Sequence, residues 1–150
     1  MDVLEPNQNK QPLVYLHKLT DIEAALHNIE DDLEGVSFEE FIENKKLRQS
    51  IMYELHIVST SSRFLLHILS EADKQQSSWL RKAFAPIPFK ALVVLREMFF
   101  HEGENCRASD EENYRLVWNM CKNDLPAIKN NICKIRPVVA EKYTLLRRKN

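Results

Sequence analysis

Apolar residues recur every three or four positions along most of the chain, which is the spacing of one face of an α-helix. The first series predicts a long helix that ends at Gly35, a residue typical of helix ends. This series is Leu13, Leu16, Leu19, Ile22, Leu26, Ile29 and Leu33.

A second long helix is predicted from a series that begins at Leu47 and ends at Leu69. It carries a further apolar stripe, Ile57, Phe64 and Ile68, on another side. Helices that are apolar on more than one side lie centrally in a bundle or in an oligomer interface.

Shorter signals divide the rest of the chain. Ser37-Phe38-Glu39-Glu40 has the form of a capping box and predicts a short helix after Ser37, and Ser109-Asp110-Glu111-Glu112 is a second capping box. The polar residues 71–78 indicate a loop. A last apolar series, over residues 114–132, contains Pro126, so we expect a kink there.

The stretch from Pro88 to His101 is almost wholly apolar but contains Arg96. An unpaired charge in apolar surroundings is costly, so Arg96 needs a partner, a partly hydrated cleft or an anionic ligand. In one straight helix Arg96 and His101 would be about 140° apart and would not converge. Either the helix ends near Phe100, as Gly103 indicates, or a second copy of the chain completes the pair.

Arg96 and His101 suit the cleavage of a phosphodiester bond. That reaction needs a cation near the phosphate and a group that both takes and gives a proton near neutral pH. An arginine and a histidine at this spacing also recur by chance. The pair therefore indicates catalysis only together with the rest of the chain.

Composition indicates a single all-α domain. The 150 residues are 44% hydrophobic and 29% charged, enough for a substantial core, and the 2 glycines are few for a sheet protein. We expect a flexible arm over residues 1–11, a helical domain over 12–136 and a basic C-terminal tail over 137–150. The net charge of −1 provides no overall field toward nucleic acid or membrane.

Several groups of polar residues have a structural and a functional interpretation. The three cysteines, Cys106, Cys121 and Cys133, match no zinc pattern and indicate reduced thiols. The carboxylates of residues 30–34 could form a metal site, but no histidine lies among them, which favours a solvated helix end. Ser59-Thr60-Ser61-Ser62 could line a phosphate site or allow close helix packing.

We predict neither a metal site nor a cofactor. Four histidines lack ligand-like neighbours and are interpreted as surface or packing residues, namely His17, His27, His56 and His67. The polar N-terminus is unlike a signal peptide, and no apolar run is long enough to span a bilayer, so we expect a cytoplasmic protein without a membrane partner.

Taken together, these segments resemble the HepT-like branch of the HEPN superfamily, small all-helical proteins that pair with MNT-type nucleotidyltransferases in toxin–antitoxin systems. The resemblance covers roughly residues 13–133. Its motifs are residues 35–41, Leu47-Arg48-Gln49-Ser50, Ile87-Pro88-Phe89, the Arg-x4-His motif at 96–101, Leu116-Val117-Trp118 and Asp124-Leu125-Pro126.

The resemblance implies an antiparallel bundle of four to five helices that forms a homodimer and acts as a metal-independent endoribonuclease toxin. The Arg-x4-His motifs of two protomers would meet in one cleft. His101 would be the general acid/base for attack of a 2′-hydroxyl on the adjacent phosphate. Arg96 would bind that phosphate and Glu97 would support it. RNA would be the substrate and an MNT-type nucleotidyltransferase the antitoxin.

The chain departs from the family pattern at three places. The family's Arg-x4-His-x-Tyr motif ends in a tyrosine that the partner adenylylates, and here Gly103 takes its place. A Gly-Glu-Ala sequence is replaced by the stretch around residues 59–62. The residue after the arginine is often Asn or Asp in the family, and here it is the longer Glu97. In addition, Glu97, Glu102 and Glu104 add negative charge around the motif. These departures leave a second interpretation open, a non-catalytic helical subunit that binds or presents substrate to a nucleotidyltransferase.

Overall fold

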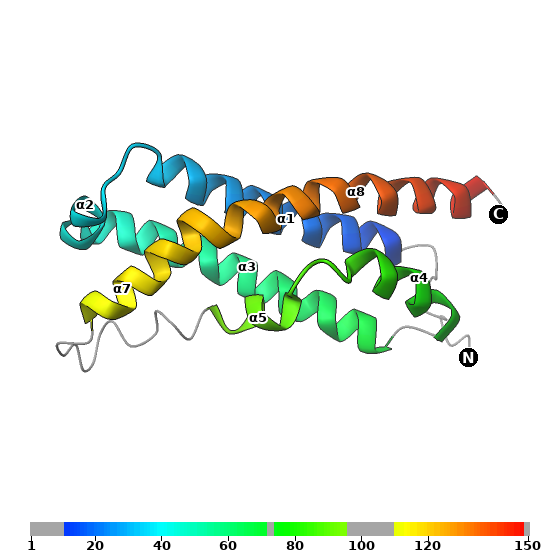
Figure 1. Ribbon diagram of the computed structural model, residues 1–150. Helices are drawn as coiled ribbons and strands as arrows, with labels where there is room; N and C mark the ends of the chain where they lie inside the picture. The colour runs from blue at the N-terminus through cyan, green and yellow to red at the C-terminus, as the bar shows by residue number, and fades with distance from the viewer. Residues whose placement is uncertain (1–10, 72–73, 96–109, 149–150) are drawn as a thin grey trace, which may run out of the picture.

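The computed structural model describes residues 11–71, 74–95 and 110–148 of the chain, and within these ranges every regular element is a helix (Figure 1). The predicted all-α class is therefore confirmed. The elements are α1 (Gln11–Leu33), α2 (Phe38–Glu43), α3 (Lys45–Glu71), α4 (Lys74–Phe84), α5 (Phe89–Val93), α7 (Asp110–Asn119), the π-helical η1 (Met120–Asp124) and α8 (Leu125–Arg148).

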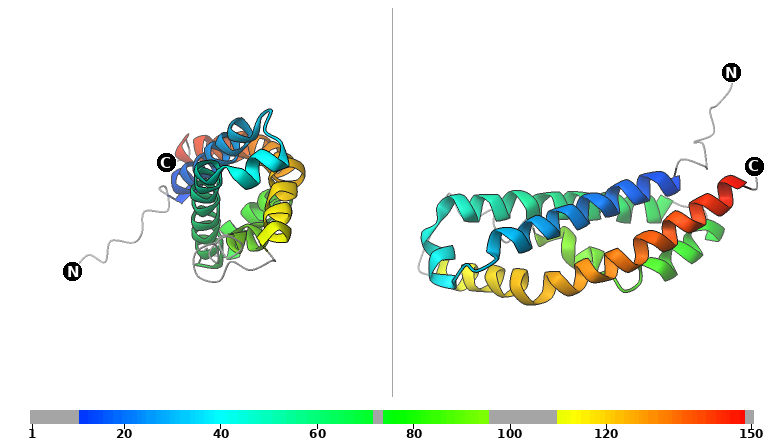
Figure 2. Two further views of the ribbon diagram at one scale, coloured as in Figure 1. Left: turned by 90° about the vertical axis from the view of Figure 1, so that its left-hand side faces the viewer. Right: turned by 90° about the horizontal axis from the view of Figure 1, so that it is seen from above.

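The long helix α1 is antiparallel to both α3 and α8. Its end near Lys18 lies beside Phe64 of α3, and its end near Asp32 lies beside Ser50. Figure 2 shows α1 between α3 on one side of the bundle and α8 on the other, while α5 packs on α3 and α4 contacts α3 and α8. No helix in the described part of the chain is long and apolar enough to cross a membrane.

The apolar series that predicted the long helices forms the core. Leu19, Ile22 and Ile29 of α1 are completely inaccessible to solvent, as are Leu55 and Val58 of α3. The further stripe of α3 behaves differently, because Ile57 and Ile68 are half-buried and Phe64 is 41% exposed. Ile57 and Ile68 thus still pack against the core, whereas Phe64 lies at the surface of the protomer.

The predicted helix boundaries near residue 35 are confirmed. Gly35 has a φ of +70°, a conformation that glycine adopts without strain, and it ends the turn after α1. The Ser37 Oγ accepts a hydrogen bond of 3.1 Å from the Glu40 backbone N–H, as expected of a capping box. Asn44 caps α3 in the same way through its contact with the Leu47 N–H, at 3.0 Å.

Arg48 joins three elements at one end of the bundle. Its side chain is buried, and Nη1 donates to the carbonyl oxygens of Phe41, at 3.2 Å, and of Ile42. Its guanidinium lies 4.8 Å from the ring centroid of Tyr114 on α7. The backbone carbonyls and the aromatic ring replace part of the hydration that a buried cation loses.

The loop predicted over residues 71–78 is wrong for its described residues, because Glu71 still belongs to α3 and α4 begins at Lys74. The first two turns of α4 are polar, and its buried residues Leu80 and Phe84 lie in the second half. A helix whose apolar face begins so late leaves no periodic signal in its first turns.

The C-terminal helix contains two prolines. The irregularity expected at Pro126 takes the form of the π-helical turn η1 just before it, and Pro126 itself lies in the first turn of α8, where its missing N–H costs little. Farther on, α8 continues through Pro137, and Val139 is fully buried. The predicted domain boundary at residue 136 therefore does not coincide with a helix end, whereas residues 1–10 of the predicted arm lie outside the described residues.

Replacing Arg48 by alanine should lower the free energy of unfolding by about 2–3 kcal/mol, because the buried carbonyls of Phe41 and Ile42 would lose a charged donor. Urea denaturation followed by circular dichroism measures this. The exposed neighbour Lys46 provides the control, since Lys46→Ala should change the stability by less than about 0.5 kcal/mol. Equal effects of the two substitutions would contradict the role given to Arg48.

A second prediction concerns Tyr15, which is 1% exposed and whose hydroxyl has no hydrogen-bond partner among the described residues. Burial raises the pKa of Tyr15 from 10.0 to about 12. As the pH rises above 10 the unfolded chain loses this proton first, so the protein loses stability toward pH 12. Tyr15→Phe should therefore be at least as stable as the wild type at pH 7, and its advantage should grow above pH 10.

Urea denaturation of the wild type and of Tyr15→Phe at pH 7 and pH 10.5 tests this. Tyr53→Phe is the matched control, because the Tyr53 side chain is 64% exposed and its hydroxyl meets water in both states. A stability difference for Tyr15→Phe that does not change with pH would show that Tyr15 ionises equally in the folded and unfolded chain.

Candidate functional site

The predicted catalytic residues Arg96 and His101 lie outside the described residues, as do Glu97 and Gly103. The structure describes the stretch that leads to them, residues 88–95. Within this stretch, α5 lies just before the predicted catalytic segment in the chain (Figure 1).

The helix α5 is short and amphipathic. Pro88 precedes it, and the Pro88 carbonyl accepts a hydrogen bond of 3.0 Å from the Leu92 N–H. Phe89, Leu92 and Leu95 are buried, whereas Val94 is 48% exposed. The buried side fixes α5 on the core, and the opposite side leaves an apolar residue at the surface immediately before the predicted catalytic segment.

A serine of α3 holds the end of α5. The Ser59 Oγ donates a hydrogen bond of 2.5 Å to the carbonyl oxygen of Val93, and Ser59 is 1% exposed. Ser61 and Ser62 are also buried, whereas Thr60 faces solvent. The three serines thus serve close packing, and the alternative that they line an open phosphate site does not hold for them.

Glu54 on α3 is a buried acid that sequence reasoning missed. Only 9% of it is exposed; its Oε1 accepts a hydrogen bond of 3.2 Å from Nδ2 of Asn28, and its Oε2 has no partner among the described residues. The sequence contained one sign of this burial, because Glu54 directly precedes Leu55 of the apolar series of α3. Its position between α1 and α3 ties the two helices together.

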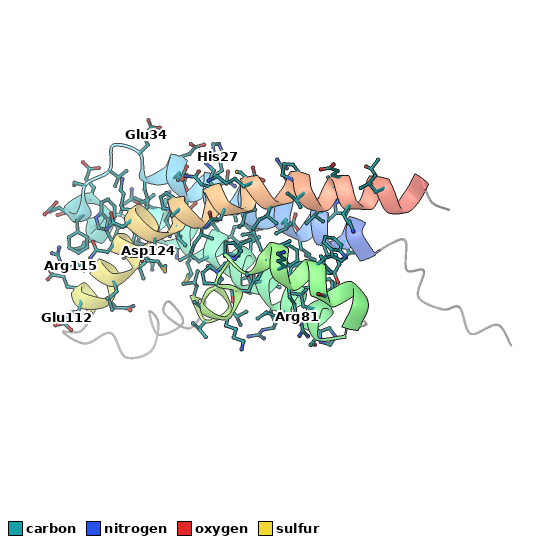
Figure 3. All side chains as sticks on the ribbon, turned by 45° about the vertical axis from the view of Figure 1, so that its right-hand side comes forward. His27, Glu34, Arg81, Glu112, Arg115 and Asp124 are labelled. Carbon is teal, nitrogen blue, oxygen red and sulfur yellow. The ribbon has the colours of Figure 1, made fainter. Side chains whose placement is uncertain are left out.

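The surface between α1 and α8 carries a group of charged side chains beside a hollow of about 450 Å³. Lys129 Nζ lies 2.7 Å from Glu30 Oε2, Arg136 Nε lies 3.2 Å from Glu23 Oε2, and His27 Nε2 lies 3.2 Å from Asp31. His27 on α1 is labelled in Figure 3, near α8. Because Lys129 and Arg136 each have a carboxylate partner, this surface has little net attraction for an anion.

These pairs bear on two interpretations of the sequence. Carboxylates of the acidic helix end contact Lys129 and, through Asp32, Ser50, and the described residues contain no group of three or more side chains suited to a metal ion. The contacts of Glu30, Asp31 and Asp32 are those of a charged helix end. His17, His27, His56 and His67 are all exposed, as expected of surface histidines.

Two of the three predicted free thiols are described. Cys121 is buried, which raises its pKa to about 12. Burial also raises the pKa of Cys133, and a contact of 3.1 Å with Glu23 Oε1 adds to the effect. Both are free thiols that stay protonated near neutral pH, so neither is a good nucleophile.

A pocket of about 310 Å³ lies where α3, α4 and α5 meet, at the beginning of the apolar stretch. Its walls are apolar, with Leu66, Phe84 and Phe89 among them, and Arg81 and Lys90 provide two cations. Figure 3 labels Arg81 on α4. Because Phe89 and Lys90 lie beside Leu66 while Val93 lies beside Ser59, α5 runs antiparallel to α3.

The chain is similar to several proteins named as ribonucleases. It is 25% identical over 114 residues to a "Putative RNase" of Methanocaldococcus jannaschii, covering 76% of this chain and 89% of that protein. It is 25% identical over 118 residues to a "Probable ribonuclease HepT" of Thermococcus cleftensis, covering 79% and 92%. A "Putative RNase" of Caldanaerobacter subterraneus is 24% identical over 127 residues, covering 84% and 95%.

The similarity extends over most of both chains in each comparison, so it concerns the whole helical unit and not one local motif. No family model matches the chain. No solved structure matches it either.

Removing the hydroxyl of Ser59 should loosen α5 without unfolding the bundle. We expect Ser59→Ala to lower the free energy of unfolding by about 1 kcal/mol, the usual contribution of one such hydrogen bond. The amides of α5 should then exchange about fivefold faster with deuterium, because local opening becomes easier. The neighbouring exposed Thr60 is the matched control, and equally fast exchange in Thr60→Ala would contradict this attachment.

Proposed function

We propose that this chain is a metal-independent endoribonuclease, the toxin of a HEPN/MNT-type toxin–antitoxin module. The observation that supports it most is the similarity, over three quarters or more of the chain, to proteins named as ribonucleases. Arg96 and His101 provide the residue types that the reaction needs, at the spacing of the motif that HepT-like proteins share.

The proposed reaction is an attack of a ribose 2′-hydroxyl on its neighbouring phosphate. His101 takes the proton of the 2′-hydroxyl, a bond forms between the 2′-oxygen and phosphorus, and the bond from phosphorus to the 5′-oxygen breaks. The leaving 5′-oxygen receives a proton from a histidine in its protonated form. The products are a 2′,3′-cyclic phosphate and a 5′-hydroxyl end, so no water is consumed in this step.

Arg96 has the electrostatic role in this proposal. Its guanidinium donates to the phosphate oxygens and stabilises the additional negative charge of the phosphorane. Glu97 supports Arg96 by offsetting part of the positive charge where two copies of the motif approach each other.

We also propose that the active unit is a homodimer. Two Arg96 and two His101 side chains would share one cleft, which removes the need for them to converge within one helix. The surface exposure of Val94 supports an interface at this place, since it leaves an apolar side chain uncovered next to the motif.

The proposed antitoxin is an MNT-type nucleotidyltransferase in the cytoplasm. Because Gly103 replaces the family's tyrosine, adenylylation at that position is not available, and neutralisation would occur by direct contact or by modification elsewhere. Tyr114 is the next tyrosine in the sequence, and its ring is half-buried between Phe41, at 6.3 Å, and Arg48. That packing disfavours Tyr114 as the modified residue.

The second candidate is a non-catalytic subunit that binds a nucleotidyltransferase or presents substrate to it. The acidic residues Glu97, Glu102 and Glu104 favour it, because negative charge beside the motif opposes the approach of RNA. RNA cleavage by the chain without its partner separates the two candidates.

Purified protein should cleave single-stranded or transfer RNA in the presence of EDTA and leave 2′,3′-cyclic phosphate ends. His101→Ala should reduce the first-order cleavage rate by about 10²- to 10⁴-fold, the usual contribution of a general acid/base. His17→Ala, at an exposed histidine of α1, is the matched control and should cleave at the wild-type rate. If His101→Ala cleaves as fast as the wild type, His101 is not the general acid/base.

A further inference from the structure

Between Lys45 and Ser70, one side of α3 is exposed and carries no acid. Between Lys45 and Ser70 the only acidic residue is Glu54, and Glu54 is buried. We name the exposed side the outer face of α3. Its residues are Lys45, Lys46, Gln49, Tyr53, His56, Thr60, Arg63, Phe64 and His67.

The outer face of α3 combines cations with exposed aromatic rings. Tyr53 is 64% exposed and Phe64 41%, and Lys18 of α1 extends its ammonium group to 4.7 Å from the Phe64 ring centroid. Arg63 is exposed beside Phe64. In a chain with 21 basic and 22 acidic residues, such a separation of charge gives this face a local potential that the net charge conceals.

Nothing in the described part of the chain covers this face. Figure 2 shows α3 along one side of the bundle, with α1 and α5 at its edges and with α7 and α8 on the opposite side. Acids lie near its ends and edge: on α1, Asp32 accepts a hydrogen bond from Ser50 at 2.8 Å, and the exposed Glu43 precedes Lys45 in the sequence.

We propose that the outer face of α3 binds a single-stranded part of the RNA substrate. This rests on the proposed ribonuclease function and adds to it the surface that holds the substrate. Cations attract the phosphates, and exposed aromatic rings stack with bases irrespective of sequence. Tyr53 and Phe64 are about 16 Å apart along the helix, so one extended strand can contact both.

The contact between α3 and the end of α5 supports the proposal. Ser59, at the edge of the face, donates its hydrogen bond to Val93, just before Arg96 in the sequence. Thr60, the next residue, is exposed on the face itself. A strand lying along α3 therefore passes the point where the chain enters that segment.

A second copy of the chain is a less suitable occupant. A two-fold interface brings the same surface against itself, so Lys46 and Arg63 would meet a face that carries cations and no carboxylate to pair with them. A polyanion has the complementary charge. The homodimer proposed above uses the other surface, around Val94.

The test measures binding of a short fluorescein-labelled single-stranded RNA by fluorescence anisotropy, with every variant made in the His101→Ala background to prevent cleavage. Arg63→Glu should weaken binding about tenfold and should reduce the dependence of affinity on salt concentration, because a phosphate contact is lost. Tyr53→Ala should weaken it about fivefold or more through the loss of one stacked base.

Two matched controls lie on other helices. Lys134→Glu makes the same change of charge on the exposed side of α8, and Leu116→Ala removes an exposed apolar side chain, 58% accessible, from α7. Both should bind RNA with the affinity of the His101→Ala parent. Circular dichroism checks that each variant keeps its helical content.

The outcomes separate the two proposals. If the wild type cleaves RNA but Arg63→Glu and Tyr53→Ala bind it as tightly as the controls, the outer face of α3 is not the RNA surface and the ribonuclease proposal stands. If Arg63→Glu changes the oligomeric state in light scattering, the face is an interface between copies, which overturns the inference. If the wild type neither binds nor cleaves RNA, both proposals fail.

Discussion

The burial of one side of α1 is the constraint on which the rest of the structure depends. Leu19, Ile22 and Ile29 are withdrawn completely from water between α3 and α8, and each such side chain contributes about 1.5–3 kcal/mol. Because α1 occupies one side of α3 and the buried residues of α5 occupy another, α3 keeps a third side without a partner helix. The arrangement of the core thus decides which side of α3 is available to a ligand.

The surface between α1 and α8 and the outer face of α3 differ in whether their cations have carboxylate partners. On the side formed by α1 and α8, Lys129 and Arg136 contact Glu30 and Glu23, and the pKa of Lys129 is raised chiefly by its hydrogen bond to Glu30. Those cations hold helices together. On the outer face of α3 no described carboxylate contacts Arg63, so its charge is available to a partner. Local pairing, and not the net charge of −1, therefore indicates where an anion can bind.

The sequence was sufficient for the features that depend on local chemistry. The helical class, the stop at Gly35 and the cap at Ser37 follow from periodicity and from the conformational preferences of single residues, and the structure confirms them. The sequence was insufficient where the structure depends on contacts between residues that are far apart in the chain. The helical start of α4 at Lys74 lacks an apolar period, and the partner of Ser59 lies far away in the sequence, at Val93. Arg96, Glu97 and His101 remain predictions, because they lie outside the described residues.

The two proposals place binding and chemistry in separate parts of this fold, and such a separation would explain how a nearly neutral chain acts on a polyanion. Affinity for single-stranded RNA depends on the sum of several exposed contacts, which a long straight helix supplies at regular spacing. Catalysis depends on the exact position of a few groups, which requires a firmly held support. The Ser59 hydrogen bond to Val93 joins the two parts, because it fixes the end of α5 to the helix that carries Tyr53 and Arg63. A change in Ser59 should therefore act mainly on the cleavage rate, and a change in Arg63 mainly on affinity.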